Sequence, residues 1–436
     1  MKLFVIPTHR NCEAAITSIL KEINYAICKN EKVCLAVVEN SKKNIFLKNK
    51  EFLKELARTN DFPIYHIGLE NMRKIIKLIS QHSKIDEKKL FKLIYPQGIN
   101  YGKIANYIYI LATILKASSI HRRDSDCFTD GLKFSQYPIV QENKYINQKV
   151  IDIKDIDRTE NLVYSGNDKI CIVGGGYHGN WNIDMEEINK LNPNAMKILM
   201  NISGVNKHDI CAQFQNKYIE NTLFNDKQPL LNTVFSDSFE PECGNISVAE
   251  VYKYIPNFIG ENGIGFDYHT YFMSIIVKVP IIFHYNKIFH IHDVRRNNDI
   301  NILRYWRGII KMVDFDCVHK KFLEKGFDKK LCEKEFGLNV LSANFTEKIP
   351  NFFEDVLSSI SLEERLLKID QIINEILKQT KKTKYIKTGD YLNSNKLTII
   401  DELNEEYSLS LELQRLWHVI MQASIDISQK QVIKRL

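Results

Sequence analysis

The chain has 436 residues, of which 44% are hydrophobic and 26% charged, and its formal net charge is +7. This length exceeds that of one average domain and predicts one large domain with an additional smaller region. The mild positive charge suits an anionic small molecule as well as nucleic acid. No basic run with interleaved aromatic residues is present, so we expect no nucleic-acid partner. No apolar run is long enough to span a bilayer, and Pro7 interrupts the apolar run at the N-terminus. We therefore expect neither a transmembrane segment nor a secretion signal.

Apolar strands and amphipathic helices alternate over residues 1–126. The strands are continuously apolar, as expected where helices cover both faces of a sheet. Right-handed crossovers make such a sheet parallel. In chain order we expect a strand at 2–7, a helix at 11–28, a strand at 32–41, a helix at 47–60, a strand at 62–68, a helical stretch at 71–95 broken near Ser83, a helix at 100–118 and a strand at 118–124.

The pattern changes to short strands and loops between about 150 and 300, and it becomes helical from about 300 onward. We therefore expect an α/β domain over residues 1–300 and a helical C-terminal region over 301–436. The C-terminal helices offer a surface for a homo-oligomer or another partner. The lysine-rich stretch 378–389 indicates a solvated linker or a helix end.

Nine cysteines are scattered along the chain, and none of them forms a CxxC pair. An odd number of cysteines without a secretion signal is typical of reduced thiols. We therefore expect a cytoplasmic protein, and the cysteine spacing indicates no zinc site.

Two carboxylates, Asp124 and Asp126, follow the fourth expected strand with one serine between them. Ligands of a doubly wound sheet bind outside the carboxyl ends of its strands. Mg²⁺ usually takes one or two carboxylates from a protein and the remaining oxygens from phosphate and water. The pair therefore predicts a site for Mn²⁺ or Mg²⁺, and the alternative is a solvated Asp-Ser-Asp turn.

The stretches FVIPTHRN, LAVVENS and INYGKIANYIYILATILKASSIHRRDSD resemble nucleotide-sugar glycosyltransferases of the GT-A fold, in the family-2-like group. The resemblance covers about residues 1–296 and ends in the DxD metal motif. It implies a Rossmann-like, mostly parallel sheet with helices on both faces, a nucleotide-binding half over 1–126 and an acceptor half over 127–300. It also implies metal-dependent transfer of a sugar from a nucleoside-diphosphate-sugar, such as a UDP-sugar, to an acceptor that it does not identify. The two arginines of HRRDSD depart from the family, which often has apolar residues and an acid there.

The resemblance also implies a donor site. Thr8 and Glu39 would meet the ribose and the base, with Asn40 as the alternative to Glu39, although such residues also cap turns. Guanidinium groups bind phosphate bidentately, but neighbours on a strand point to opposite faces, so Arg122 and Arg123 are not expected to share one role. The expected donor-binding residues are Thr8, Arg10, Glu39, Asn40, Lys103, Arg122, Arg123, Asp124, Gly175 and Gly176.

Two later stretches supply candidates for the acceptor side. In VGGGYHGNW (173–181) the glycines allow close approach of the backbone. The resemblance implies that such a segment borders the donor sugar and the acceptor, so Tyr177, His178 and Trp181 are expected to stack on one of them. The alternative there is a flexible hairpin loop over tucked-in aromatic rings. In ENGIGFDYHTYF (261–272) Asp267 and Glu261 are the candidate bases for the acceptor proton, and Asp267 could equally cap a helix.

Two histidines, His290 and His292, lie on the same side of an expected strand in KIFHIHDVRR. The resemblance implies a late histidine that completes the metal site, and imidazole suits Mn²⁺. His292, nearer the strand end, is the first choice, and the alternative is a half-exposed pair at a strand edge.

Two other functions compete with a glycosyltransferase. A nucleotidyltransferase-like enzyme would need a glycine-rich loop directly after the first strand, which PTHRNCEAA lacks. A non-catalytic nucleotide-sugar-binding or scaffold protein would not require Asp124 and Asp126, and its C-terminal helices would be its interaction surface.

Overall fold

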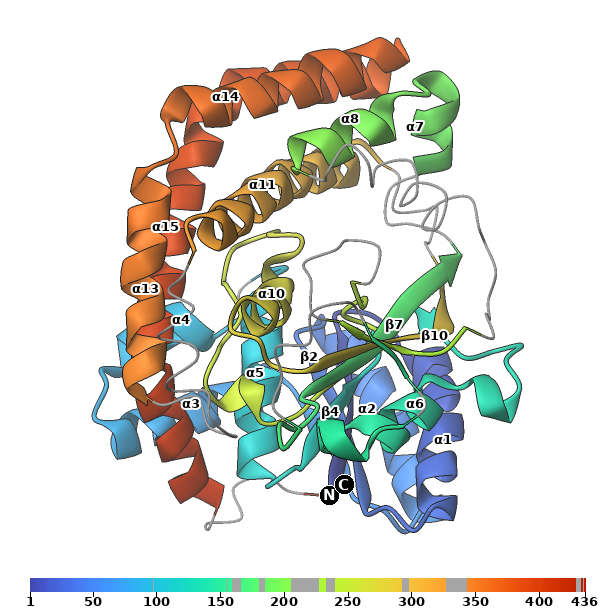
Figure 1. The fold of residues 1–436 in the computed structure, drawn as a ribbon. Helices are drawn as coiled ribbons and strands as arrows, with labels where there is room; N and C mark the ends of the chain where they lie inside the picture. Colours follow the sequence, from blue (N-terminus) through green and yellow to red (C-terminus); the bar gives the residue numbers. More distant parts are fainter. Residues whose placement is uncertain are drawn as a thin grey trace.

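The computed structural model describes residues 1–96, 98–154, 156–158, 166–179, 185–204, 227–232, 240–291, 298–326, 343–428, 433 and 435–436. Within these ranges one mixed sheet lies at the centre, with helices on both of its faces (Figure 1). Among the described residues, no helix combines the length and the apolar character needed to cross a membrane.

The first half of the sheet follows the alternation that the sequence predicts, including the break near Ser83. Continuous apolar runs make the strands buried on both faces, as in KLFVIPT at the N-terminus. The elements are β1 (Lys2–Thr8), α1 (Glu13–Cys28), β2 (Val33–Glu39), α2 (Lys43–Thr59), β3 (Ile64–Ile67), α3 (Leu69–Ser83), α4 (Glu87–Ile94), α5 (Tyr101–Ile114) and β4 (Ser119–Arg122).

The middle of the chain adds shorter elements. They are β5 (Cys127–Phe128), η1 (Phe134–Gln136), α6 (Pro138–Tyr145), η2 (Val150–Asp152), β6 (Asp157–Arg158), β7 (Ile172–Gly179), α7 (Met185–Leu191), α8 (Ala195–Ile202), β8 (Leu230–Asn232), β9 (Ile246–Val248), η5 (Val251–Lys253), η6 (Phe266–Tyr268), α10 (His269–Ile276) and β10 (Ile281–His290). The glycine run lies inside β7 and not in a loop after a strand. A Cβ on Gly175 would lie 2.6 Å from the ring of His284 on β10, so glycine permits the close approach of these two strands.

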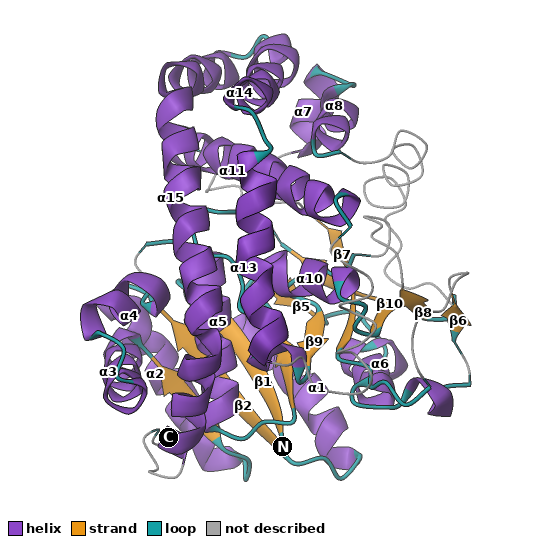
Figure 2. Ribbon diagram, turned by 60° about the vertical axis from the view of Figure 1, so that its left-hand side comes forward, coloured by secondary structure: helices purple, strands orange, loops and turns teal. Residues whose placement is uncertain are grey.

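The C-terminal region is helical, as the sequence predicts. Its elements are α11 (Asp299–Glu324), α13 (Ala343–Ser358), α14 (Leu362–Gln371), the π-helical η8 (Ile372–Leu377), η9 (Lys378–Thr380) and α15 (Thr383–Ile427). Figure 2 shows α13 and α15 running side by side. The lysine-rich stretch 378–389 is a helix end, since η9 stops at Thr380 and the 45-residue α15 starts at Thr383.

The strand order is β3-β2-β1-β4-β9-β7-β10-β8-β6, and β5 pairs with β10 off this path. The chain moves outward from β1 to β2 and β3, and then returns to β4 on the other side of β1. A reversal of this kind leaves a crevice at the carboxyl ends of the two central strands, where α/β proteins bind ligands. The segments after β1 and β4 therefore face each other.

Of the three hydrophobic clusters in the described residues, two cover the opposite faces of the sheet around β1 and β2. One joins β1 and β2 to α1, α2 and α6. The other joins the opposite face to α3, α4 and α5 and continues into α11, α13 and α15, so the C-terminal helices share a core with the sheet. The predicted α/β fold, with a mostly parallel sheet, helices on both faces and a helical C-terminal region, is confirmed.

Candidate functional site

A cavity of about 400 Å³ opens at the crevice between β1 and β4. Its walls come from the loop after β1, the start of α5, the segment after β4, the ends of β7 and β10, the loop before η6 and the first turns of α11. Its volume is within the range of small-molecule sites, about 300–1,000 Å³. The cavity is therefore the candidate site.

The two carboxylates of the DxD motif both line this cavity, and each binds an arginine. Arg10 Nη1 donates to Asp126 Oδ2 at 2.9 Å, and Arg122 Nε donates to Asp124 Oδ1 at 2.9 Å. Burial raises the pKa of Asp124, although Arg122 acts in the opposite direction. The segments after β1 and β4 are thus joined directly by the Arg10–Asp126 pair.

His290 reaches the same cavity through strand pairing. The short β5 pairs with β10 so that His290 lies opposite Cys127, and the backbone N–H of Ile291 donates to the carbonyl of Asp126 at 3.0 Å. His290 Nε2 is 3.7 Å from Asp126 Oδ2, and its ring stacks on Tyr177 with 5.0 Å between centroids. The other predicted histidine, His292, lies outside the described residues.

The ligands available for a divalent cation are two carboxylates and one imidazole. In the described part of the chain, no group of three His, Cys, Asp or Glu side chains could by itself hold a metal ion. Mg²⁺ commonly completes its coordination with phosphate oxygens and water. Asp124, Asp126 and His290 do not complete a metal site by themselves, although their oxygen and nitrogen atoms are of the kinds that Mn²⁺ and Mg²⁺ bind.

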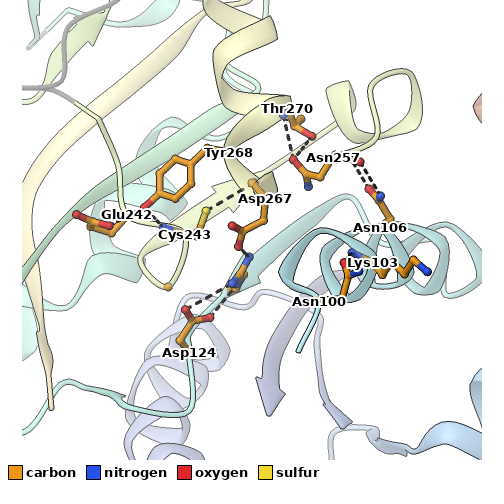
Figure 3. A network of polar contacts seen from close by, with 12 residues as sticks. Asn100, Lys103, Asn106, Asp124, Glu242, Cys243, Asn257, Asp267, Tyr268 and Thr270 are labelled. Carbon is orange, nitrogen blue, oxygen red and sulfur yellow. Dashed lines mark hydrogen bonds and ion pairs between the residues drawn. The ribbon is translucent and has the colours of Figure 1, made fainter. Parts of the chain in front are cut away.

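Arg122 also connects the motif to the η6 segment. Its Nη1 donates to Asp267 Oδ2 at 2.8 Å, so Asp124 and Asp267 lie on two sides of one guanidinium (Figure 3). Beyond Asp267, Tyr268 Oη donates to Glu242 Oε2 at 2.6 Å and accepts from the backbone N–H of Cys243 at 3.2 Å. This network fixes η6 beside the end of β4.

A second set of contacts attaches α5 to the same region (Figure 3). Asn106 Nδ2 donates to the carbonyl of Asn257 at 2.8 Å, and its Oδ1 accepts from the Asn257 backbone N–H at 2.6 Å. Asn257 Oδ1 in turn accepts from the backbone N–H of Thr270 at 3.0 Å. All three residues are buried, so α5 and α10 are held in fixed positions around the cavity.

Neither candidate base lines the cavity wall in this structure. The Asp267 side chain is 6% exposed and lies behind Arg122. Glu261 is exposed, and its backbone N–H and carbonyl are bound by Glu406 and Lys311. The base role of both carboxylates stays a prediction.

The two adjacent arginines have separate surroundings, as the alternation of a strand predicts. Arg122 lines the cavity, whereas Arg123 is 1% exposed on the other face of the sheet. Arg123 Nε and Nη2 donate to the two oxygens of Glu22 at 2.8 and 2.7 Å, and its Nη1 lies 3.0 Å from Glu142 Oε1. The structure therefore gives Arg123 a place in a buried ion-pair cluster.

The donor residues predicted near the strand ends divide into two groups. Thr8 and Asn40 line the cavity. Glu39 is fully buried instead, with its carboxylate 3.1 Å from His66 Nε2 and 2.6 Å from Asn49 Nδ2. Lys103 is absent from the cavity wall and donates to the carbonyl of Lys92 at 2.6 Å.

The aromatic candidates of β7 also divide. Tyr177 lines the cavity, and its hydroxyl accepts from the Gly244 backbone N–H at 2.8 Å and donates to Asp124 Oδ2 at 3.5 Å. Gly175, Gly176 and His178 are not part of the wall, and the ring of His178 packs on Phe289. Trp181 lies outside the described residues.

The first turns of α11 contribute a wall that the sequence did not predict. Arg304 and Tyr305 lie on it, together with the buried Trp306. The Arg304 side chain is exposed and forms no hydrogen bond or ion pair with any described residue. Helical periodicity shows which residues share a face, but it does not show that this face covers the carboxyl ends of the strands.

Comparison with known proteins identifies a family. Two solved structures are similar at low identity: one titled as a mycobacterial protein (10% identity, 72% of this chain and 74% of that chain, TM-score 0.37) and one of S. aureus TarS 1–349 (12% identity, 96% and 90%, TM-score 0.35). No curated protein matches the chain. A family model described as a family of unknown function, DUF6271, matches residues 3–433. The chain therefore belongs to the DUF6271 family of unknown function.

Proposed function

We propose that this protein is a metal-dependent glycosyltransferase that moves a sugar from a nucleoside-diphosphate-sugar, for example a UDP-sugar, to an acceptor. One observation supports this most strongly. The paired carboxylates Asp124 and Asp126 share a single cavity with three arginines, Arg10, Arg122 and Arg304, at the topological switch point of an α/β sheet. Such a combination suits a ligand that carries both a diphosphate and a bound cation.

The donor would lie across the carboxyl ends of β1, β2 and β4. Thr8 and Asn40 are the polar residues that we assign to the nucleoside, with Tyr101 at the start of α5 as a third wall residue. The arginines face the diphosphate, because guanidinium groups offer phosphate two parallel N–H donors. Arg304 is the cavity arginine that no other described residue engages.

Asp124 and Asp126 would hold Mn²⁺ or Mg²⁺, with His290 as the nitrogen ligand. A divalent cation there would offset the negative charge that develops on the diphosphate as the glycosidic bond breaks. The cavity residues of this chain would bind and orient the diphosphate. The Tyr177 hydroxyl donates a hydrogen bond to Asp124, which helps to hold that carboxylate in place.

We assign proton removal from the acceptor to Asp267, with Glu261 as the second candidate. Arg122 holds Asp267 Oδ2 at the edge of the site, and this role requires that the other oxygen, now outside the cavity wall, become accessible to the acceptor hydroxyl when the donor binds. When the carboxylate takes the hydroxyl proton, the acceptor oxygen bonds to the anomeric carbon. The nucleoside diphosphate then leaves with the electron pair of the broken bond. Tyr177, Tyr305 and Trp306 are the aromatic residues of the wall that would contact the sugar or the acceptor.

The test needs no known acceptor, because water can replace it slowly. The protein is incubated with a panel of nucleoside-diphosphate-sugars and MnCl₂, and release of the nucleoside diphosphate is measured. We expect release from one donor, with a loss of about 100-fold or more in an Asp124→Asn/Asp126→Asn double variant.

Asp130→Asn is the matched control. Asp130 is exposed in the same segment and pairs with Lys21 outside the cavity wall, so its loss should not change the rate. Undiminished release by the double variant would contradict the metal assignment. Tight donor binding without release would instead support the non-catalytic binding protein.

A further inference from the structure

We propose that Arg10 and Arg122 close the cation site of the free protein, and that the diphosphate of the donor opens it by taking these arginines away from the carboxylates. The cation and the diphosphate would then bind as one unit, and the cation alone would bind weakly. This inference rests on the proposed function and concerns the regulation of the same site.

The first support is that both carboxylates are already engaged. Asp126 Oδ2 accepts from Arg10 Nη1 at 2.9 Å. Both oxygens of Asp124 accept from Arg122, from Nε at 2.9 Å and from Nη2 at 3.4 Å. A cation must use the same oxygens, so it competes with guanidinium groups whose charge-assisted bonds are stronger than neutral ones.

The second support is the charge of the cavity wall. The described wall carries Arg10, Arg122 and Arg304 against the two carboxylates Asp124 and Asp126, and it includes no other Asp or Glu. The sum of these charges is positive, which repels a free divalent cation and attracts an anion. The charge of the wall therefore favours binding of the diphosphate before binding of the bare cation.

The third support is the incomplete ligand set. Two carboxylates and His290 leave several coordination positions of Mn²⁺ or Mg²⁺ unfilled. A diphosphate supplies oxygens for these positions, and it also supplies the anionic partner that the displaced arginines need. One ligand thus meets both requirements.

The two arginines have different freedom to move. Arg122 also holds Asp267, and its side chain is 11% exposed. Arg10 is 28% exposed, and Asp126 is the one described carboxylate that it binds. We therefore assign the larger movement to Arg10, with Arg122 releasing Asp124 while it keeps Asp267.

The experiment measures bound Mn²⁺ through the loss of the free-ion electron paramagnetic resonance signal, with and without UDP and the other nucleoside diphosphates. For the wild type we expect weak binding of Mn²⁺ alone and binding at least about tenfold tighter with the matching diphosphate. For Arg10→Gln we expect Mn²⁺ alone to bind about tenfold tighter than to the wild type, and the diphosphate without metal to bind more weakly. A misfolded variant would lose the cavity and should bind Mn²⁺ more weakly, which is the opposite of the expected change.

Arg415→Gln is the matched control, because it removes an arginine from an exposed pair with Glu354 outside the cavity wall. Equal binding of Mn²⁺ alone to the wild type and Arg10→Gln would overturn the inference. Where neither binds measurable Mn²⁺ alone, equal diphosphate affinity of the two proteins would also overturn it. Absence of any binding by the wild type, even with Mn²⁺ and diphosphate together, would instead refute the proposed function.

Discussion

Replacing Arg123 with methionine should severely destabilise the fold, although Arg123 itself does not line the cavity. Arg123 binds both oxygens of Glu22 and lies 3.0 Å from Glu142, and all three side chains are at most 2% exposed. Removing one partner of a buried ion pair costs about 3–5 kcal/mol, because the remaining charge stays buried without compensation. Glu142 keeps His121 Nδ1 at 2.6 Å, so the cost falls mainly on Glu22, and we expect a loss within this range of about 3–5 kcal/mol.

Urea denaturation at pH 7, followed by circular dichroism, measures this change. Arg415→Met is the control, because Arg415 and Glu354 are 40% and 52% exposed, and the loss of an exposed pair should cost less than about 1 kcal/mol. A loss below about 1 kcal/mol in Arg123→Met would refute the reasoning, because it would mean that the cluster does not hold buried charges.

Two further substitutions test the packing and the electrostatics of α5. Gly102→Ala should cost at least about 2 kcal/mol in urea denaturation, because its Cβ would lie 1.6 Å from the carbonyl oxygen of Phe258, and a cost near zero would contradict this close approach. Burial, with repulsion from Lys92, lowers the pKa of Lys103 to about 8 from its ordinary value of 10.5. Between these values the unfolded chain binds more protons, so the stability of the wild type relative to Lys103→Met should rise from pH 8 to pH 10. A constant difference would contradict the shift.

The first half of the fold could be predicted from the sequence because its signals are local. Each strand from β1 to β4 is a short apolar run, and each helix has its own apolar stripe. Even the division of 71–95 into α3 and α4 could be located, near Ser83, and α3 ends there before Lys84 with its positive φ of 59°.

Later elements depend on partners that are distant in the sequence. The two-residue strand β5 exists because it pairs with β10, about 160 residues further on. Gly174–Gly176 suggested a loop, but close contact with neighbouring segments makes glycine suitable inside β7. Gly389 and the polar residues after it have a low helix propensity, so the sequence does not predict the full length of α15. Packing against η8 outweighs this low propensity in the structure.

The sequence predicts those residues of the site that lie at or after the ends of strands. Asp124, Asp126, Thr8 and Asn40 come directly at or after strand ends, and the structure brings them to one cavity. Glu39, the last residue of β2, is buried in a polar cluster with His66, a contact that needs the pairing of β2 with β3.

The contacts of the arginines could not be predicted from local sequence patterns. Arg10 binds Asp126, which is 116 residues away in the sequence, because the switch point places the two segments opposite each other. Arg304 joins the wall only through the packing of α11 over the sheet.

The central claim is that the cavity binds a nucleoside diphosphate with a divalent cation. Its most direct test is a thermal-shift measurement with a panel of nucleoside diphosphates, with and without Mn²⁺, on the wild type and the Asp124→Asn/Asp126→Asn variant. A ligand at one hundred times its Kd stabilises the folded state by about 2.7 kcal/mol, which is readily detected. We predict Mn²⁺-dependent stabilisation by one diphosphate that is lost in the variant. No stabilisation of the wild type by any diphosphate, with Mn²⁺ present, would contradict the account.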